Sequence, residues 1–139
     1  MTIWSLVQLY GAMAVAFFAI DIVWIGTVAA NFYDRYLGHM MAANVNWAAA
    51  LIFYAIYISG ILVFAVLPGI EAGSLTRAIA LGAFLGFFAY ATFDLTCMAL
   101  FEGFSWTVVV TDIAWGTFLT GAVATAGYLA GQWMGLTPG

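Results

Sequence analysis

Four long runs of apolar residues make up most of this 139-residue chain. They extend over about residues 3–30, 47–67, 76–100 and 106–133, with short polar stretches between them. A helix that crosses a bilayer needs about 20 predominantly apolar residues, and each run reaches that length. The sequence therefore predicts an all-α membrane protein. We expect one domain over residues 1–139, in which four transmembrane helices form an antiparallel bundle with short loops.

The composition excludes the main alternatives to a membrane protein. Hydrophobic residues make up 67% of the chain and charged residues 6%, whereas an average soluble domain carries about 25% charged residues. A soluble fold of this size could not cover its surface with so few charges. A net charge of −4 with only two Lys and Arg residues excludes nucleic-acid binding, because a run of phosphates would stay unneutralised. The 18% aromatic content excludes a disordered chain.

Tryptophans lie near the ends of the predicted spans. Four spans place both termini on the same side of the membrane, here called side A. Trp4 and Trp133 then fall at side A, and Trp47 and Trp106 at the opposite side B, which is the pattern of an aromatic belt at each interface. One arginine on each side leaves the positive-inside rule nearly balanced, and the amino terminus favours side A as cytoplasmic. The first run has no positively charged n-region, so we expect it to stay in the membrane rather than be cleaved.

Three aspartates lie inside the predicted spans, where each costs about 2.5–3.5 kcal/mol at mid-membrane. Asp21, Asp94 and Asp112 belong to three different spans. At a rise of about 1.5 Å per residue, they lie roughly 9–13 Å from the side-B end. The second span adds Tyr54 and Tyr57 at a similar depth. We therefore expect the four helices to form a polar layer in the side-B half of the bundle.

Helical spacing groups further aromatic residues with these aspartates. A tryptophan follows two of the aspartates at i+3, and a tyrosine precedes the third at i−4. An indole N–H can donate to a carboxylate, or the ring can wall a cavity. The candidate ligand- or proton-binding residues are Asp21, Trp24, Tyr54, Tyr57, Tyr90, Asp94, Asp112 and Trp115. The competing interpretation gives each aspartate a separate structural role, such as reaching towards headgroup water.

Small residues recur four positions apart in the third and fourth predicted spans. The pairs are Gly82 and Gly86, Gly116 and Thr120, and Gly127 and Gly131. This spacing lets helix backbones approach closely in lipid, where burying apolar surface does not drive helices together. We expect these pairs to form contacts within the bundle, and a dedicated homodimer face is the alternative.

Other residues with reactive or metal-binding side chains are sparse. His39 and the single cysteine, Cys97, lie on distant segments, so they do not form the set of converging ligands that a metal site needs. No metal or other cofactor is therefore predicted. Nucleophile, phosphate-loop and zinc motifs are missing from the sequence, and no catalytic residue is assigned.

Several short motifs resemble those of a known family. They are Asp21-Ile-Val-Trp24-Ile-Gly26, Asn31-Phe32-Tyr33, Leu37-Gly38-His39, Phe53-Tyr54, Phe64-Ala-Val66-Leu-Pro68, Tyr90-Ala-Thr92-Phe-Asp94-Leu-Thr96 and Thr111-Asp112-Ile-Ala-Trp115-Gly116. Together they cover nearly the whole chain and resemble the bacterial small membrane proteins grouped as domain-of-unknown-function family 2177. The resemblance implies a four-helix protein of the bacterial inner membrane, and it implies no particular activity.

Three functions are compatible with these features. The first is a small carrier, permeation or ligand-binding protein, since proton-binding carboxyls inside the membrane are what proton-coupled transport requires. The second is an accessory or structural subunit of a larger respiratory, photosynthetic or export complex. The third is an enzyme acting on a lipid, quinone or isoprenoid, with the carboxyls and Tyr90 as general acid–base groups. The sequence favours the first, and the partners we expect are the lipid bilayer and a second copy or a larger membrane complex, with no nucleic acid.

Overall fold

The computed structural model describes residues 1–41 and 44–138, and within that part of the chain every regular element is a helix. In chain order the elements are α1 (Ile3–Trp24), the π-helical η1 (Ile25–Ala29), α2 (Ala30–Leu37), the 3₁₀ turn η2 (Gly38–Met40), α3 (Trp47–Ile61), the π-helical η3 (Leu62–Val66), α4 (Leu67–Ala72), α5 (Leu75–Leu100) and α6 (Trp106–Trp133). Four continuous helical stretches are long and apolar enough to cross a membrane: Ile3–Ala29, Trp47–Ala72, Leu75–Leu100 and Trp106–Trp133. The all-α class with four spanning helices is thereby confirmed.

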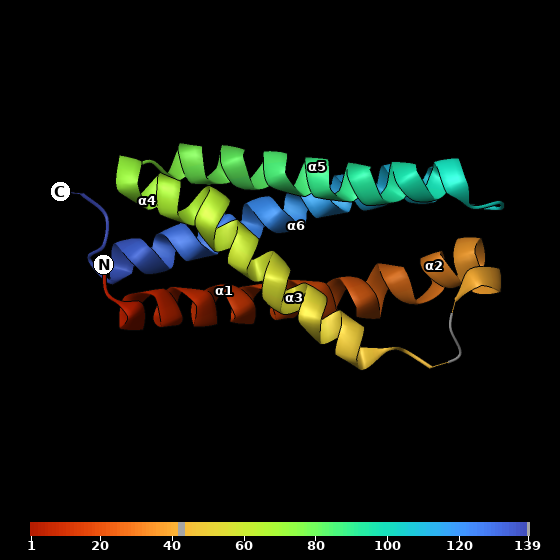
Figure 1. Cartoon of the computed structure of the whole chain (residues 1–139), viewed down its shortest axis with the longest axis horizontal. Coiled ribbons are helices and arrows are strands. Elements are labelled where there is room, and N and C mark those ends of the chain that lie inside the picture. The colour runs from red at the N-terminus through yellow and green to blue at the C-terminus, as the bar shows by residue number, and fades with distance from the viewer. Residues whose placement is uncertain (42–43, 139) are drawn as a thin grey trace.

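The four stretches form an antiparallel bundle, and the beginning of α1 and the end of α6 lie at the same end of it (Figure 1). Helices α5 and α6 pack against each other along their length, and α1 packs against α6. Helix α3 crosses the bundle diagonally, so that α4 lies beside α5 while the beginning of α3 diverges from it (Figure 1). The backbones of the second and third spans therefore lie side by side at α4 and separate towards the beginning of α3.

The second span is longer than the expected 47–67, because the helix continues through Pro68 to Ala72. Pro68 stands at the start of α4, directly after the π-helical segment, and such a segment accommodates a residue that lacks an N–H donor. The helix ends at Gly73, whose φ of 63° is the left-handed conformation that favours glycine. Ser74 then caps α5 by accepting a hydrogen bond from the Arg77 N–H at 3.1 Å. The connection between the second and third spans is thus only a tight turn.

The stretch between the first two spans is more helical than the polar loop expected from the sequence. The helix continues past the end of the first span at Ala29 through α2 to Leu37, before the 3₁₀ turn begins. Asn46 caps α3, its side-chain oxygen accepting from the Ala49 N–H at 3.1 Å. Positions 42 and 43 of the expected loop lie outside the described residues, as does position 139, the last of the expected domain.

Glycines bring α5 and α6 into close contact. A Cβ added at Gly82 would lie 2.6 Å from the Ala124 Cβ, and one added at Gly86 would lie 2.7 Å from the Thr120 Oγ1. Gly127 and Gly131 of α6 instead face other helices: their Cβ positions lie 2.7 Å from Val66 and 2.5 Å from Ile70. The small residues therefore serve packing within one chain, as expected for helices whose association depends on backbone proximity.

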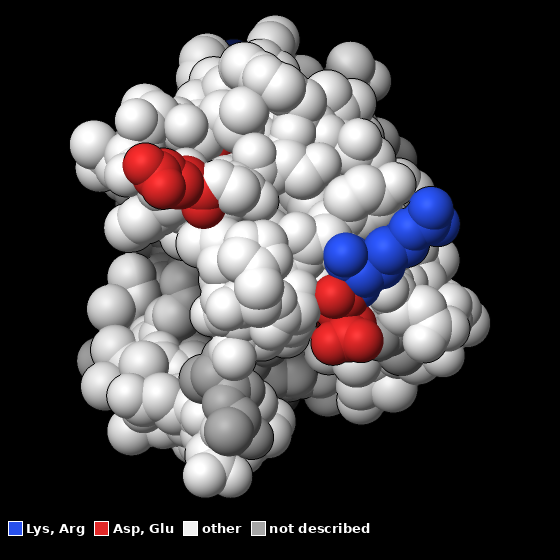
Figure 2. Space-filling model, turned by 90° about the vertical axis from the view of Figure 1, so that its right-hand side faces the viewer, with Lys and Arg blue, Asp and Glu red and all other residues white. Residues whose placement is uncertain are grey.

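Large apolar side chains cover the outer surface. The tryptophans near the span ends are among the most exposed, at 67% for Trp4, 89% for Trp133, 64% for Trp47 and 62% for Trp106. Figure 2 shows the end of the molecule formed by α2 and the α5–α6 loop, where a few charged side chains stand on an otherwise uncharged surface. This distribution is typical of a helix bundle that is surrounded by lipid.

The close approach of α5 and α6 can be tested at Gly86. Gly86→Ala is expected to destabilise the protein by about 1–3 kcal/mol, because the added methyl would overlap Thr120 and the backbone of Gly116. Gly11→Ala is a matched control, since nothing lies within 4 Å of its Cβ position, and alanine favours a helix more than glycine does. Unfolding of both variants in detergent micelles measures the difference. Equal stability of the two variants would contradict the packing described here.

Candidate functional site

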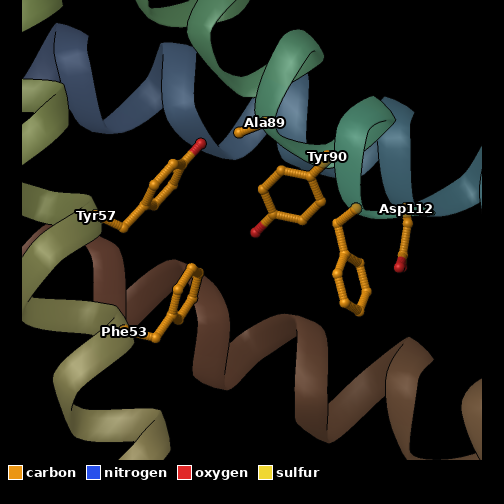
Figure 3. Close-up of a pocket in the computed structure, with 6 residues that line it drawn as sticks. Phe53, Tyr57, Ala89, Tyr90 and Asp112 are labelled. Carbon is orange, nitrogen blue, oxygen red and sulfur yellow. The ribbon is translucent and has the colours of Figure 1, made fainter. Parts of the chain in front are cut away.

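A cavity of about 440 Å³ lies between α3, α5 and α6. It is lined by Phe53, Tyr57, Ala89, Tyr90, Phe93 and Asp112. Figure 3 shows the side chains of α3 on one side of the cavity, with Tyr90 on α5 and Asp112 on α6 across from them. Phe53 and Phe93 are 48% and 61% exposed, so the cavity reaches the outer surface of the bundle. Its walls are thus largely apolar, and its polar groups are two phenols and one carboxyl.

The cavity exists because α3 diverges from α5 and because Tyr90 fits against a glycine. A Cβ at Gly116 would overlap the ring of Tyr90, so the ring lies flat on the backbone of α6. The Tyr57 and Tyr90 rings meet edge to face, with centroids 6.2 Å apart. Tyr57 is held in turn by a 2.6 Å hydrogen bond between its hydroxyl and that of the buried Thr120. Both phenols are therefore held in place at the inner end of the cavity.

Asp112 accepts a hydrogen bond from the hydroxyl of Tyr33. Tyr33 belongs to α2, beyond the end of the first span, and its side chain reaches back to α6. Burial, reinforced by the hydrogen bond to the Asp112 carboxylate, raises the pKa of Tyr33 above the ordinary value of 10 for a phenol. The phenol consequently stays protonated at physiological pH and remains a hydrogen-bond donor to Asp112.

Asp94 is fully buried on α5, and neither of its oxygens receives a hydrogen bond from a described group. Its polar neighbour is the carboxyl of Asp112, which in its ionised form is also only an acceptor. Two adjacent carboxyls can share one proton, and the protonated partner then donates to the other. The Asp94–Asp112 pair can therefore hold a proton behind the cavity.

Asp21 lies apart from this pair. Its Oδ2 accepts a 3.4 Å hydrogen bond from the hydroxyl of Tyr54, which joins α1 to α3. Tyr90 lies within electrostatic range of both Asp21 and Asp112. Two of the three aspartates thus meet directly, and the third lies on a neighbouring side of the same polar layer.

The two candidate tryptophans pack against each other instead of each serving an aspartate. The rings of Trp24 and Trp115 stack with centroids 4.2 Å apart and planes 10° from parallel. Trp24 also meets the Tyr33 ring edge to face, with centroids 6.5 Å apart. Of the two roles expected for an indole beside a carboxyl, the structure shows the packing role: the stack closes the α1–α6 side of the layer.

Sequence reasoning missed the residues that complete the site. Tyr33 lies between the first two predicted spans, the sequence singles out Thr120 only as a small residue, and Phe53 and Phe93 carry no polar group. Tyr33 stands in one of the family-like motifs, Asn31-Phe32-Tyr33, which is the one signal that could have found it. Among the described residues no three His, Cys, Asp or Glu side chains gather as metal ligands would.

The fold and the carboxyls inside the spans define an α-helical membrane protein of four spans with polar groups inside the bundle. The model of the predicted membrane protein family DUF2177 matches residues 6–129, and the chain belongs to that family. Neither the curated proteins nor the solved structures that were compared gave a significant match.

The unpaired state of Asp94 predicts that this residue does not stabilise the fold. Asp94→Leu is expected to unfold no more easily than the wild type, because it removes a buried polar group that has no donor. Asp94→Asn is expected to fold as well and to lose activity. Unfolding in micelles measures the first expectation. A loss of more than about 2 kcal/mol in the leucine variant would show that Asp94 has a donor and a structural role.

Proposed function

We propose that this protein is a small carrier of the bacterial inner membrane. It binds its ligand in the cavity between α3, α5 and α6, and it couples the movement of that ligand to a proton on the Asp94–Asp112 pair. The observation that supports this most is the presence of a carboxyl, Asp112, in the lining of a cavity that reaches the bundle surface. A second acid stands behind that carboxyl, fully buried and without a donor.

The energetics of the buried acid favour a functional role over a structural one. A charged or unpaired polar group in a transmembrane helix is expensive, and such groups commonly mark ion or proton pathways. No N–H or hydroxyl group of the described residues donates to Asp94 to offset this expense, and its polar partner is the carboxyl of Asp112. The other titratable groups near the pair on the surrounding helices are Tyr33, Tyr90 and Cys97. Phenols and thiols hold their protons more tightly than carboxyls do, so the pair is the site that we assign to proton exchange.

The cavity also explains why a second copy would help. A single chain of four helices gives a narrow pathway, and this cavity opens at the outer surface between α3 and α5. A homodimer that covers this opening would enclose the ligand between two chains. The orientation with both termini in the cytoplasm is part of the same proposal.

Proton movement in liposomes tests the carrier. Liposomes that contain a pH-sensitive dye and the reconstituted wild-type protein are expected to change their internal pH faster than protein-free liposomes when organic ions of either charge are added outside, because the proton moves with the ligand. Asp112→Asn is expected to reduce this movement to the rate of protein-free liposomes, because it removes the proton-binding carboxyl of the cavity. Glu71→Gln is the matched control, since Glu71 is exposed on α4 at the other end of the bundle.

The result that contradicts the carrier is wild-type proton movement no faster than that of protein-free liposomes, both with and without added organic ions. Equal movement in the wild type and the Asp112→Asn variant would contradict it as well. Monodisperse elution of each variant in detergent separates a loss of transport from a loss of folding.

A further inference from the structure

We infer that the cavity selects a lipophilic organic cation, such as an aromatic or quaternary ammonium compound, over neutral and anionic molecules. This inference rests on the proposed function and names the substrate class of the same site. Three properties of the cavity carry it: the sign of its charge, the nature of its walls and the direction from which it is entered.

The charge around the cavity is of one sign. Asp112 lines it, Asp94 adjoins Asp112, and Asp21 lies across the same layer. No residue that lines the cavity is a cation. An anionic ligand would therefore meet carboxyls without a compensating positive group, whereas a cation would pair with Asp112.

The two arginines of the chain are engaged or remote. The Arg35 guanidinium lies over the ring of Tyr36 at 5.5 Å on α2. Arg77 stands in the first turn of α5, which at about 1.5 Å per residue is roughly 20 Å along the helix from Tyr90. Arg77 is too distant to neutralise the carboxyls at the cavity, and Arg35 is exposed on α2 and does not line the cavity. The positive charge at the cavity therefore comes from the ligand or from a proton.

The walls of the cavity are suited to an organic cation. Phe53 and Tyr57 on α3 face Tyr90 on α5 across the space (Figure 3), and Phe93 of α5 also lines it. Aromatic faces attract cations, quaternary ammonium groups in particular. A small inorganic cation would need about six oxygen ligands, but the lining offers one carboxyl and two phenols. The volume of about 440 Å³ falls within the range of about 300–1,000 Å³ for small-molecule sites.

The entrance favours a lipophilic ligand. The cavity reaches the surface beside Phe53 and Phe93, which are 48% and 61% exposed in the part of the bundle that spans the membrane. A ligand that partitions into the bilayer can enter from the side, between α3 and α5. A hydrated polar solute would first have to lose its water in the hydrocarbon region.

A pair of ions with the same shape and opposite charge tests this inference. Equilibrium binding to the purified protein in detergent is measured with tetraphenylphosphonium and with tetraphenylborate. The phosphonium is expected to bind saturably at one site per cavity, and the borate is expected to bind at least about tenfold more weakly. Asp112→Asn is expected to weaken phosphonium binding by at least about tenfold as well, while Glu71→Gln leaves it unchanged.

Phe93→Ala is the second variant. Its side chain is 61% exposed, so the truncation leaves the core intact, and loss of one aromatic wall is expected to weaken phosphonium binding by about two- to tenfold. Equal binding of the two ions, absence of phosphonium binding, or binding unaffected by Asp112→Asn would each overturn the inference.

Together, the binding and proton-movement experiments test the cation site and the carrier function independently. Asp112-dependent proton movement without phosphonium binding would support the carrier and overturn the cation site. Phosphonium binding that depends on Asp112, in a protein that moves no protons, would support the cation site and overturn the carrier.

Discussion

The contact between the backbones of α5 and α6 is the interaction on which the rest of the structure depends. Lipid provides no hydrophobic force that would hold these helices together, so close packing has to do so. Gly82 and Gly86 on α5 and Gly116 on α6 leave the room for it. The same approach brings Asp94 of one helix next to Asp112 of the other and leaves a flat surface at Gly116 on which the Tyr90 ring lies. Packing and polar layer thus arise from one set of residues.

The diagonal path of α3 determines what the polar layer can reach. Where α4 lies beside α5 the bundle is closed by apolar contacts, and towards the beginning of α3 the helices separate (Figure 1). Asp112 consequently lines a cavity that reaches the outer surface, whereas Asp94 stays fully buried behind it. A half-buried acid that lines a cavity, in contact with a fully buried acid, is an arrangement in which a bound cation and a proton would compete for the same charge.

The sequence predicted the parts that depend on run length and on helical periodicity. The length of the four apolar runs predicts the spanning helices. The positions of the three aspartates along those runs predict polar groups at a similar depth. It could not predict that Asp94 and Asp112 meet while Asp21 pairs with Tyr54, because this depends on the order of the helices around the bundle. The role of Tyr33 does not follow from the pattern because the helix continues past the first span into α2, and the π-helical η1 before α2 shifts the faces that an α-helical period assigns. Phe53 and Phe93 line the cavity because α3 diverges from α5. No local sequence pattern predicts that path of α3.

Carboxyl modification measures the central claim most directly, namely that an acid within the membrane is open to lipid. The purified protein in liposomes is treated with the apolar dicyclohexylcarbodiimide or with a water-soluble carbodiimide, and the modified residues are located by mass spectrometry. The account predicts that the apolar reagent modifies Asp112, that tetraphenylphosphonium protects it, and that the water-soluble reagent leaves it intact. Modification by the water-soluble reagent, or an Asp112 that neither reagent modifies, would contradict the account.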